Sequence, residues 1–204
     1  MKVRRSLPWI LLTGLVSLTA GVLLARMLAQ KPVTLQSGTW LPQARAVAPF
    51  ALTDLQGRPY SNAALAGHPS LLFFGFTYCP DVCPTTLAVL REVQQQHPLA
   101  HLQVLFVTVD PGRDTPAMLA HYLNAFSPDF VGLYGSDAAL APLLRSLGAI
   151  AVRQPLPGGG YTMDHSATLY LLDARGRMAA VFSPPFAAAG LAADLRRAAP
   201  ALTP

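Results

Sequence analysis

Two uninterrupted apolar runs dominate the pattern of hydrophobic and polar positions along this chain. Residues 71–76 read Leu-Leu-Phe-Phe-Gly-Phe, and residues 104–109 read Val-Leu-Phe-Val-Thr-Val. Runs of this length without polar alternation are typical of strands that are buried on both faces of a sheet. We therefore predict that these two segments form buried strands at the centre of the fold.

Helical and strand-like segments alternate around these two runs. Thr85 carries a hydroxyl that can accept from the following amides, so it is predicted to cap a helix over residues 86–96. Three further helices are predicted over residues 116–126, from Ser136 or Asp137 to residue 147, and over residues 187–198. Further strands are predicted at residues 50–53, 60–61, 130–133, 167–172 and 178–182. The glycines at 158–160 indicate a loop or hairpin tip at residues 155–160.

The order of these elements predicts the fold class. An N-terminal β-hairpin comes first, then alternating strands and helices, then a second β-hairpin and a last helix. Strands that alternate with helices require a partly parallel sheet that helices cover on both faces, and the closing hairpin makes the sheet mixed. This α/β layout resembles a thioredoxin-like domain.

The N-terminal segment has the pattern of a membrane anchor. Residues 6–25 carry no charge and match the ~20 residues that a helix needs to span a bilayer. Lys2, Arg4 and Arg5 precede this run, which places residues 1–5 in the cytoplasm and the rest of the chain in the periplasm. A cleaved signal peptide is the alternative, but residues 27–29 make a poor cleavage site because methionine stands where a small residue is preferred.

We therefore expect a single-pass protein of the inner (cytoplasmic) membrane. Residues 1–5 form its cytoplasmic tail, residues 6–25 an uncleaved transmembrane signal-anchor, residues 26–48 an extended linker, and residues 49–204 the folded domain.

Composition excludes two other classes of protein. Charged residues make up 12% of the chain and hydrophobic residues 52%, which excludes a disordered protein. The net charge of +5 comes from scattered basic residues without an aromatic stripe, so no nucleic-acid site is expected. Two cysteines are too few for a disulfide framework, and their close spacing favours a reactive pair or a metal site.

Cys79 and Cys83 lie between the end of the first buried strand and the helix that follows it, and each precedes a proline. The positive end of the helix dipole favours thiolate over thiol at this position. Such a pair can cycle between dithiol and disulfide, or it can bind one metal ion through two thiolates. Two inert cysteines are the weaker alternative, since core cysteines do not collect at strand-to-helix turns.

A third ligand is expected from His165. Four other histidines, His68, His97, His101 and His121, fit an ordinary surface role. His165 instead directly precedes the strand at residues 167–172, and in a thioredoxin-like sheet the loop that enters this strand faces the cysteine turn. Two thiolates and one imidazole favour copper(I) and tolerate copper(II). A closed zinc site would need a fourth ligand, so the predicted metal is copper.

Three sequence blocks carry a family resemblance. Residues 76–84 (FTYCPDVCP), 109–116 (VDPGRDTP) and 164–166 (DHS) resemble the signature blocks of the Sco/SenC family, in the same order. This resemblance extends over residues 50–198 and includes the anchor. Members of the family are membrane-anchored, thioredoxin-like copper proteins that help to assemble the binuclear copper centre of cytochrome c oxidase.

The resemblance implies roles for single residues and for partners. The metal ligands of the family fall on Cys79, Cys83 and His165. Asp81 is expected either to tune the site or to face solvent, while Asp110 and Asp114 are expected to shape their loop and to cap its helix. The implied partner is the copper-site subunit of the oxidase, together with other periplasmic copper chaperones or thiol reductants.

Two functions remain open from the sequence. One is a metallochaperone that carries copper to the oxidase, and the other is an enzyme that uses Cys79 and Cys83 as a redox-active pair to reduce the cysteines of the oxidase copper site. His165 favours the metal because a thiol reductase does not need it. A related peroxidase is disfavoured, since that chemistry needs a single exposed cysteine in a different motif.

Overall fold

The computed structural model describes residues 12–21 and 33–202 of the 204-residue chain. The chain divides into two compact units, Met1–Val33 and Thr34–Pro204. In the first unit, residues 12–21 are helical with exposed side chains. None of the helices within the described ranges combines the length and the apolar character that crossing a bilayer requires. The remainder of the expected tail and span, residues 1–11 and 22–25, lies outside the described residues.

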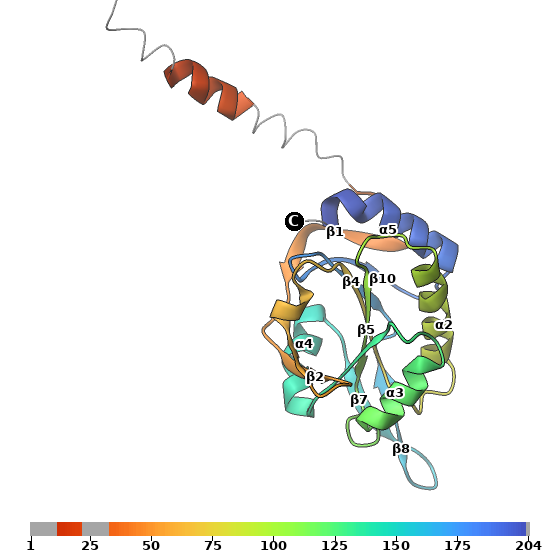
Figure 1. The fold of residues 1–204 in the computed structure, drawn as a ribbon. Helices are drawn as coiled ribbons and strands as arrows, with labels where there is room; N and C mark the ends of the chain where they lie inside the picture. The colour runs from red at the N-terminus through yellow and green to blue at the C-terminus, as the bar shows by residue number, and fades with distance from the viewer. Residues whose placement is uncertain (1–11, 22–32, 203–204) are drawn as a thin grey trace, which may run out of the picture. The chain divides into compact units, whose positions relative to one another are not determined.

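An eight-stranded mixed sheet forms the frame of the second unit (Figure 1), with the strand order β1-β10-β9-β4-β5-β6-β2-β3. Its strands are β1 (Gly38–Ala46), β2 (Ala51–Asp54), β3 (Pro59–Ser61), β4 (Ser70–Gly75), β5 (Gln103–Thr108), β6 (Val131–Tyr134), β9 (Leu169–Leu172) and β10 (Arg177–Phe182). Strands β4, β5 and β6 are parallel neighbours, whereas the remaining pairs are antiparallel. The predicted mixed α/β sheet is confirmed, including its N-terminal hairpin, β2–β3.

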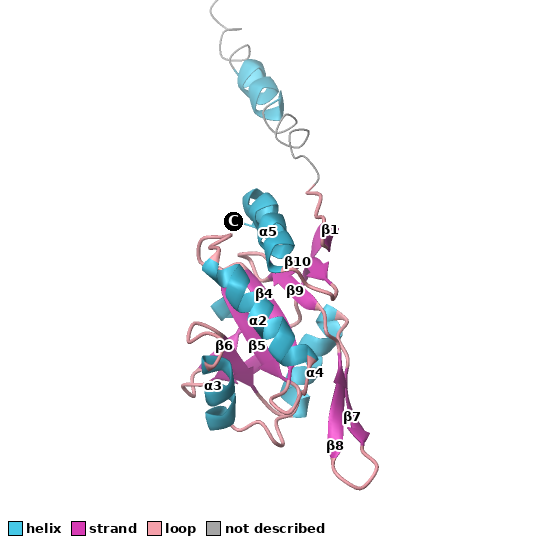
Figure 2. Ribbon diagram, turned by 90° about the vertical axis from the view of Figure 1, so that its right-hand side faces the viewer, coloured by secondary structure: helices cyan, strands magenta, loops and turns pink. Residues whose placement is uncertain are grey.

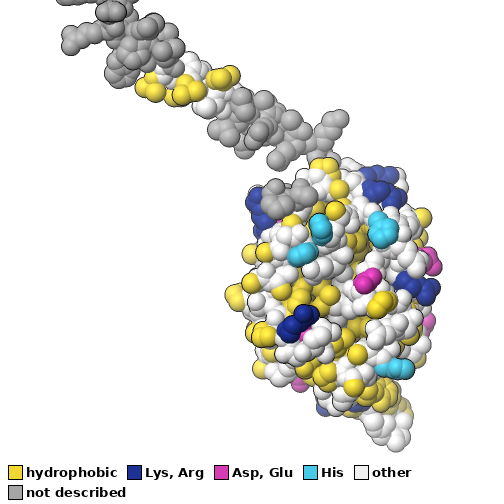
Figure 3. All heavy atoms as spheres, in the orientation of Figure 1, with side chains coloured by type: hydrophobic (Ala, Val, Ile, Leu, Met, Phe, Trp, Pro, Cys, Tyr) yellow, Lys and Arg dark blue, Asp and Glu magenta, His cyan; other side chains and the backbone are white. Residues whose placement is uncertain are grey.

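Helices lie on both sides of this sheet. They are α2 (Val82–Gln95), α3 (Pro116–Asn124), α4 (Asp137–Leu147) and α5 (Ala188–Leu202), with a short 3₁₀ helix at Asn62–Leu65. Figure 1 shows α4 on the opposite side of the central strands from α2 and α3, and α2 packs next to α5. In Figure 3, the charged side chains of this unit are scattered over the face in view and do not form one patch.

Strand β4 lies in the middle of the core. All six of its residues are buried, as its unbroken apolar run predicts. In register, Leu72 lies between Leu105 of β5 and Tyr170 of β9. Because both neighbours are also buried, β4 has no freedom to shift, and the turn that follows it is held at a defined point of the sheet.

Strand β1 falls within residues 26–48, which the sequence predicts to be an extended linker. It pairs antiparallel with β10, with an irregular register between Trp40 and Arg45. The buried Asp194 carboxylate of α5 also accepts hydrogen bonds from the Gln36 and Ser37 amides at 2.7–3.0 Å. The folded unit therefore begins before residue 49. Most side chains of β1 are exposed, so this edge strand has no hydrophobic pattern in the sequence.

The start of α2 also differs from the prediction. The helix begins at Val82, with Asp81 as its N-cap, so the expected cap Thr85 lies inside its first turn. The amide of Thr85 donates to the Asp81 carbonyl at 3.1 Å, which is a regular helical hydrogen bond. Pro84 is tolerated here because amides in the first turn have no partner within the helix. As a result, Cys83 belongs to the helix itself.

A second, two-stranded sheet is formed by β7 (Ala151–Pro155) and β8 (Tyr161–His165). The predicted hairpin tip at residues 155–160 is confirmed, whereas its two strands were not predicted. Most of their side chains are exposed or half-buried, which leaves no strand periodicity in the sequence. Figure 2 shows this hairpin projecting from the lower edge of the domain.

Gly75 at the end of β4 provides a test of this packing. A Cβ atom at Gly75 would lie 2.7 Å from the Phe106 ring and 3.0 Å from the Cys83 sulfur. We expect Gly75→Ala to lower the free energy of unfolding by ~1–3 kcal/mol, as overpacked core substitutions do. Urea denaturation followed by circular dichroism measures this change.

Gly190→Ala in α5 is the matched control, because its Cβ would make only ordinary contacts at 3.8–3.9 Å with Ser37. This variant should be neutral or gain up to ~1 kcal/mol from helix propensity. Equal stability of the two variants would contradict the packing described for Gly75.

Candidate metal centre

Cys79, Cys83 and His165 converge at one point of the domain. Their two Sγ atoms and one ring nitrogen all lie within 4.8 Å of one another. The cysteines come from the β4–α2 turn and the first turn of α2, and the histidine is the last residue of β8. Cys83 is buried, while Cys79 and His165 are half-buried, so solvent reaches the site at Cys79 and His165.

Backbone amides at the start of α2 face the sulfur of Cys79. The Cys79 amide donates to the Phe76 carbonyl at 3.2 Å, which closes the turn after β4. This turn places the Cys79 sulfur where it accepts a hydrogen bond from the Cys83 amide at 3.4 Å. An anion is stabilised at such a position, because the amides of the first helical turn have no partner within the helix.

The two thiols therefore differ in acidity. A hydrogen bond from the Cys83 thiol, together with His165 and nearby backbone amides, lowers the pKa of Cys79 to about 4 against the opposing effect of burial. Donation to Cys79 and burial in turn raise the pKa of Cys83 well above its ordinary value. At neutral pH, Cys79 is the thiolate and Cys83 retains the proton that the pair shares.

His165 turns its Nε2 atom toward the sulfurs. Its Nδ1 lies 3.1 Å from the Ser166 carbonyl oxygen. Since a carbonyl only accepts, Nδ1 is the donor of this hydrogen bond, and Nε2 lies 3.5 Å from the Cys83 sulfur. The rings of Phe73 and Phe76 make T-shaped contacts with the imidazole, with ring centroids 6.1 and 5.7 Å away. A hydrogen bond from Nδ1 to a backbone carbonyl is the arrangement that orients a histidine for metal ligation through Nε2.

Asp114 braces the segment that leads into the cysteines. Its buried carboxylate accepts from the Thr77 amide at 3.1–3.2 Å and from the hydroxyls of Thr77 and Thr108. It thereby ties the end of β4 to the end of β5, and its burial raises the pKa of this carboxyl group. The expected loop-shaping role is confirmed. The expected capping role is wrong, because the Thr115 hydroxyl accepts from the Met118 amide and caps α3.

Asp110 connects the same loop to the β7–β8 hairpin. Its fully buried carboxylate pairs with Arg113 and accepts a hydrogen bond from the Tyr161 hydroxyl at 2.8 Å. Arg113 and Tyr161 were not identified as site residues from the sequence. Arg113 lies within one of the family blocks, but no local pattern indicates a partner on a distant hairpin.

The other candidate residues lie away from the three ligating atoms. The Asp81 side chain is exposed and accepts from the Thr85 hydroxyl at 3.4 Å, and it is the backbone of Asp81 that helps to lower the pKa of Cys79. His97, His101 and His121 are exposed, and His68 is half-buried beside the His101 ring. These positions agree with the surface role expected for the four histidines.

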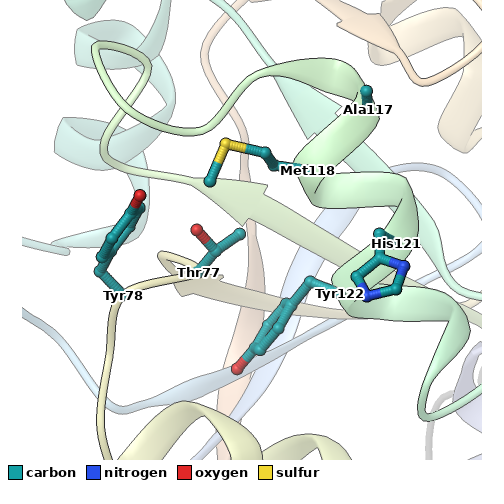
Figure 4. Close-up of a pocket in the computed structure, with 6 residues that line it drawn as sticks. All are labelled: Thr77, Tyr78, Ala117, Met118, His121 and Tyr122. Atoms are coloured by element: carbon teal, nitrogen blue, oxygen red, sulfur yellow. The ribbon is translucent and has the colours of Figure 1, made fainter.

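A largely apolar pocket of about 440 Å³ adjoins the cysteine turn. Figure 4 shows the residues that line it, which are Thr77, Tyr78, Ala117, Met118, His121 and Tyr122. Tyr78 directly precedes Cys79 and is 56% exposed. The Tyr122 hydroxyl is buried without a hydrogen-bond partner among the described residues. Burial, followed by the charges on the two cysteines and Asp114, raises the pKa of Tyr122.

The chain is similar to known proteins over most of its length. The sequence profile described as SCO1/SenC matches residues 39–200. A SCO2-like protein of Rickettsia prowazekii is 35% identical over 161 residues, which cover 76% of this chain and 78% of that protein.

Solved structures are similar over the same region. Copper-bound ScoI of Bradyrhizobium japonicum is 41% identical and has a TM-score of 0.68, covering 74% of this chain and 99% of that chain. Apo Sco1 of Thermus thermophilus is 37% identical with a TM-score of 0.71, covering 80% of this chain and 96% of that chain. With the profile match spanning most of its length, the chain belongs to the SCO1/SenC family.

Proposed function

We propose that this protein is a copper metallochaperone that holds one copper ion through Cys79, Cys83 and His165. It delivers the ion to the binuclear copper centre of cytochrome c oxidase. The convergence of two thiol sulfurs and one imidazole nitrogen within 4.8 Å is the observation that carries this proposal. The copper-bound state of the 41% identical ScoI structure supports the choice of metal.

The donor set favours copper on chemical grounds. Thiolates are soft ligands that select copper(I), while an imidazole suits both oxidation states of copper. A closed structural zinc site needs four protein ligands, and the group of metal-ligating side chains described here has three.

The protonation state of the site suits loading and release. Because Cys79 is already a thiolate, Cys83 is the one cysteine of the pair that must lose a proton when copper binds. With three protein ligands, the ion retains room for an incoming ligand. Since Cys79 and His165 are half-buried, the copper-site subunit of the oxidase can offer that ligand from the accessible side and take the ion by ligand exchange.

A thiol-disulfide reductase is the second candidate, and the acidity difference between the two cysteines favours it. The Cys79 thiolate would attack a disulfide of the oxidase copper site and release one partner thiolate, forming a mixed disulfide. Cys83 would then attack the Cys79 sulfur. This step leaves a Cys79–Cys83 disulfide and two reduced partner cysteines, and an external thiol reductant must return the pair to the dithiol. His165 has no required part in this exchange.

We also propose that residues 6–25 anchor the protein in the inner membrane, with residues 49–204 carrying the metal centre in the periplasm. The uncharged run and the preceding basic cluster support this arrangement.

The acidity difference predicts selective alkylation. At pH 6, one equivalent of iodoacetamide should modify Cys79 in the metal-free chain, because its pKa of about 4 leaves it ionised while Cys83 stays protonated and buried. Peptide mass mapping after a pH series measures this. Cys83→Ala removes the main donor to Cys79, so the midpoint should move to higher pH. First modification at Cys83 would contradict the assignment.

His165→Ala separates the two candidate functions. The variant keeps both sulfurs, so thiol-disulfide exchange should largely survive. Its copper(II) affinity should fall by more than the roughly 10–100-fold that removal of an outer-shell partner causes. Metal titration and oxidase copper loading in cells at low copper measure these effects. The double variant Cys79→Ser with Cys83→Ser is the reference that should lose both activities. Normal oxidase loading by His165→Ala would exclude the metallochaperone and leave the reductase.

The anchor predicts how the protein fractionates. The full-length chain should remain with the membrane after a carbonate wash and keep its N-terminal residues, and protease added from the periplasmic side should digest its C-terminal domain. N-terminal sequencing checks the first point. A mature soluble protein that begins near Gln30 would show that the segment is a cleaved signal peptide.

A further inference from the structure

The β7–β8 hairpin carries His165, yet it is not part of the large sheet that carries the cysteines. At its base, the Ser166 amide donates to the Ile150 carbonyl at 3.1 Å, and the Ile150 amide donates to the Ser166 hydroxyl oxygen at 3.0 Å. These two bonds close the hairpin on itself. Other contacts are therefore needed to determine where the hairpin lies relative to Cys79 and Cys83.

Arg113 makes such a contact with the hairpin and with the cysteine turn together. Its guanidinium carbon lies 3.8 Å from the centroid of the Tyr161 ring in β8 and 4.8 Å from that of Tyr78. Its Nη1 donates to the Tyr161 carbonyl at 2.9 Å. Tyr78 is the neighbour of Cys79, so one planar cation lies between the segment with the thiolate and the strand that ends at His165.

The buried Asp110 carboxylate holds this cation in place. One of its oxygens accepts from Arg113 Nε, and the other accepts from the Tyr161 hydroxyl at 2.8 Å. Asp110, Arg113 and Tyr161 thus form a closed set in which each residue binds the other two. Arg113 Nη2 is buried without a hydrogen-bond partner among the described residues, so stacking as well as hydrogen bonding determines its orientation.

We propose that Arg113 is the positioning residue that fixes the β7–β8 hairpin, and with it His165, against the cysteine pair. This inference rests on the proposed copper site, since its consequence is that Arg113 sets the strength of the imidazole-metal bond without touching the metal. Copper(II) depends on the imidazole more than copper(I) does, because two thiolates can hold copper(I) alone.

Arg153 provides a matched control. Its guanidinium carbon lies 4.2 Å from the centroid of the same Tyr161 ring, and its side chain is exposed. Its Nη2 lies near Gly112, but among the described residues Arg153 has no hydrogen bond or ion pair with the loop that carries Asp110. Arg153→Ala removes an arginine stacked on Tyr161 and should leave the position of His165 unchanged.

The test is a double-mutant cycle in the full-length chain, titrated with copper(II) and, separately, with copper(I). Arg113→Ala should weaken copper(II) binding by roughly 10–100-fold, as loss of an outer-shell partner does. In a His165→Ala background the same change should cost less than about twofold, since coupled residues are not additive. The imidazole nitrogen splitting in the electron paramagnetic resonance spectrum of the copper(II) form should be weaker in Arg113→Ala than in the wild type. Arg113→Lys should give a splitting between these two. Copper(I) affinity should change far less.

Amide hydrogen exchange of the metal-free chain tests the same idea without copper. Arg113→Ala should speed exchange in β7 and β8 and leave β4 and β5 as in the wild type, whereas Arg153→Ala should change neither region. Absence of copper binding by the wild type would refute the proposed function. Amide hydrogen exchange of the metal-free chain would still show whether Arg113 fixes the β7–β8 hairpin.

Three results would overturn the inference about Arg113. The first is amide hydrogen exchange in β7 and β8 that Arg113→Ala leaves unchanged, and the second is faster exchange throughout the domain in this variant. The third is an equal loss of copper(II) affinity on Arg113→Ala in the wild-type and His165→Ala backgrounds.

Discussion

Burial of β4 between β5 and β9 is the constraint on which the metal centre depends. A strand with six buried residues and hydrogen-bonded neighbours on both sides cannot slide or tilt without opening the core. Its last residue, Gly75, leaves no space for a side chain between Phe106 and Cys83, so Cys83 packs directly against the end of this strand. The packing of the core, together with the turn, therefore fixes the positions of the two sulfurs.

The two halves of the site are held by separate polar networks. Asp114 ties the approach to Cys79 to the end of β5 through Thr77 and Thr108. Asp110 and Arg113 tie the hairpin of His165 to the loop that follows β5. Both carboxylates belong to the seven-residue loop between β5 and α3, residues 109–115, so a single loop connects the thiolate side of the centre to its imidazole side. This arrangement combines a rigid cysteine pair with a histidine on a less embedded hairpin.

The sequence predicted the parts of this protein whose signal is local. Apolar runs indicate β4 and β5, the Cys79–Cys83 spacing beside a helix start indicates the thiol pair, and Ser136 caps α4 as expected. His165 was reached only by combining the fold with the chemistry of two thiolates. The same reasoning correctly left the other four histidines on the surface.

Features that depend on distant partners could not be predicted. Strand β1 is an exposed edge whose pairing with β10 spans most of the chain, so its residues resemble a linker. The contact of Arg113 with Tyr161 joins residues 48 positions apart. Helix α2 begins earlier than expected because Pro84 fits its first turn. Proline breaks the interior of a helix but is accepted in the first turn, so from sequence alone Pro84 could lie either before the helix or within its start.

X-ray absorption at the copper edge tests the central claim most directly, because it reports the atoms bound to the metal. The full-length chain loaded with one equivalent of copper should show two sulfur scatterers and one imidazole nitrogen, and His165→Ala should lose the imidazole pattern while it keeps both sulfurs. A first shell of oxygen and nitrogen atoms alone, or an unchanged imidazole pattern in His165→Ala, would contradict a site made of Cys79, Cys83 and His165.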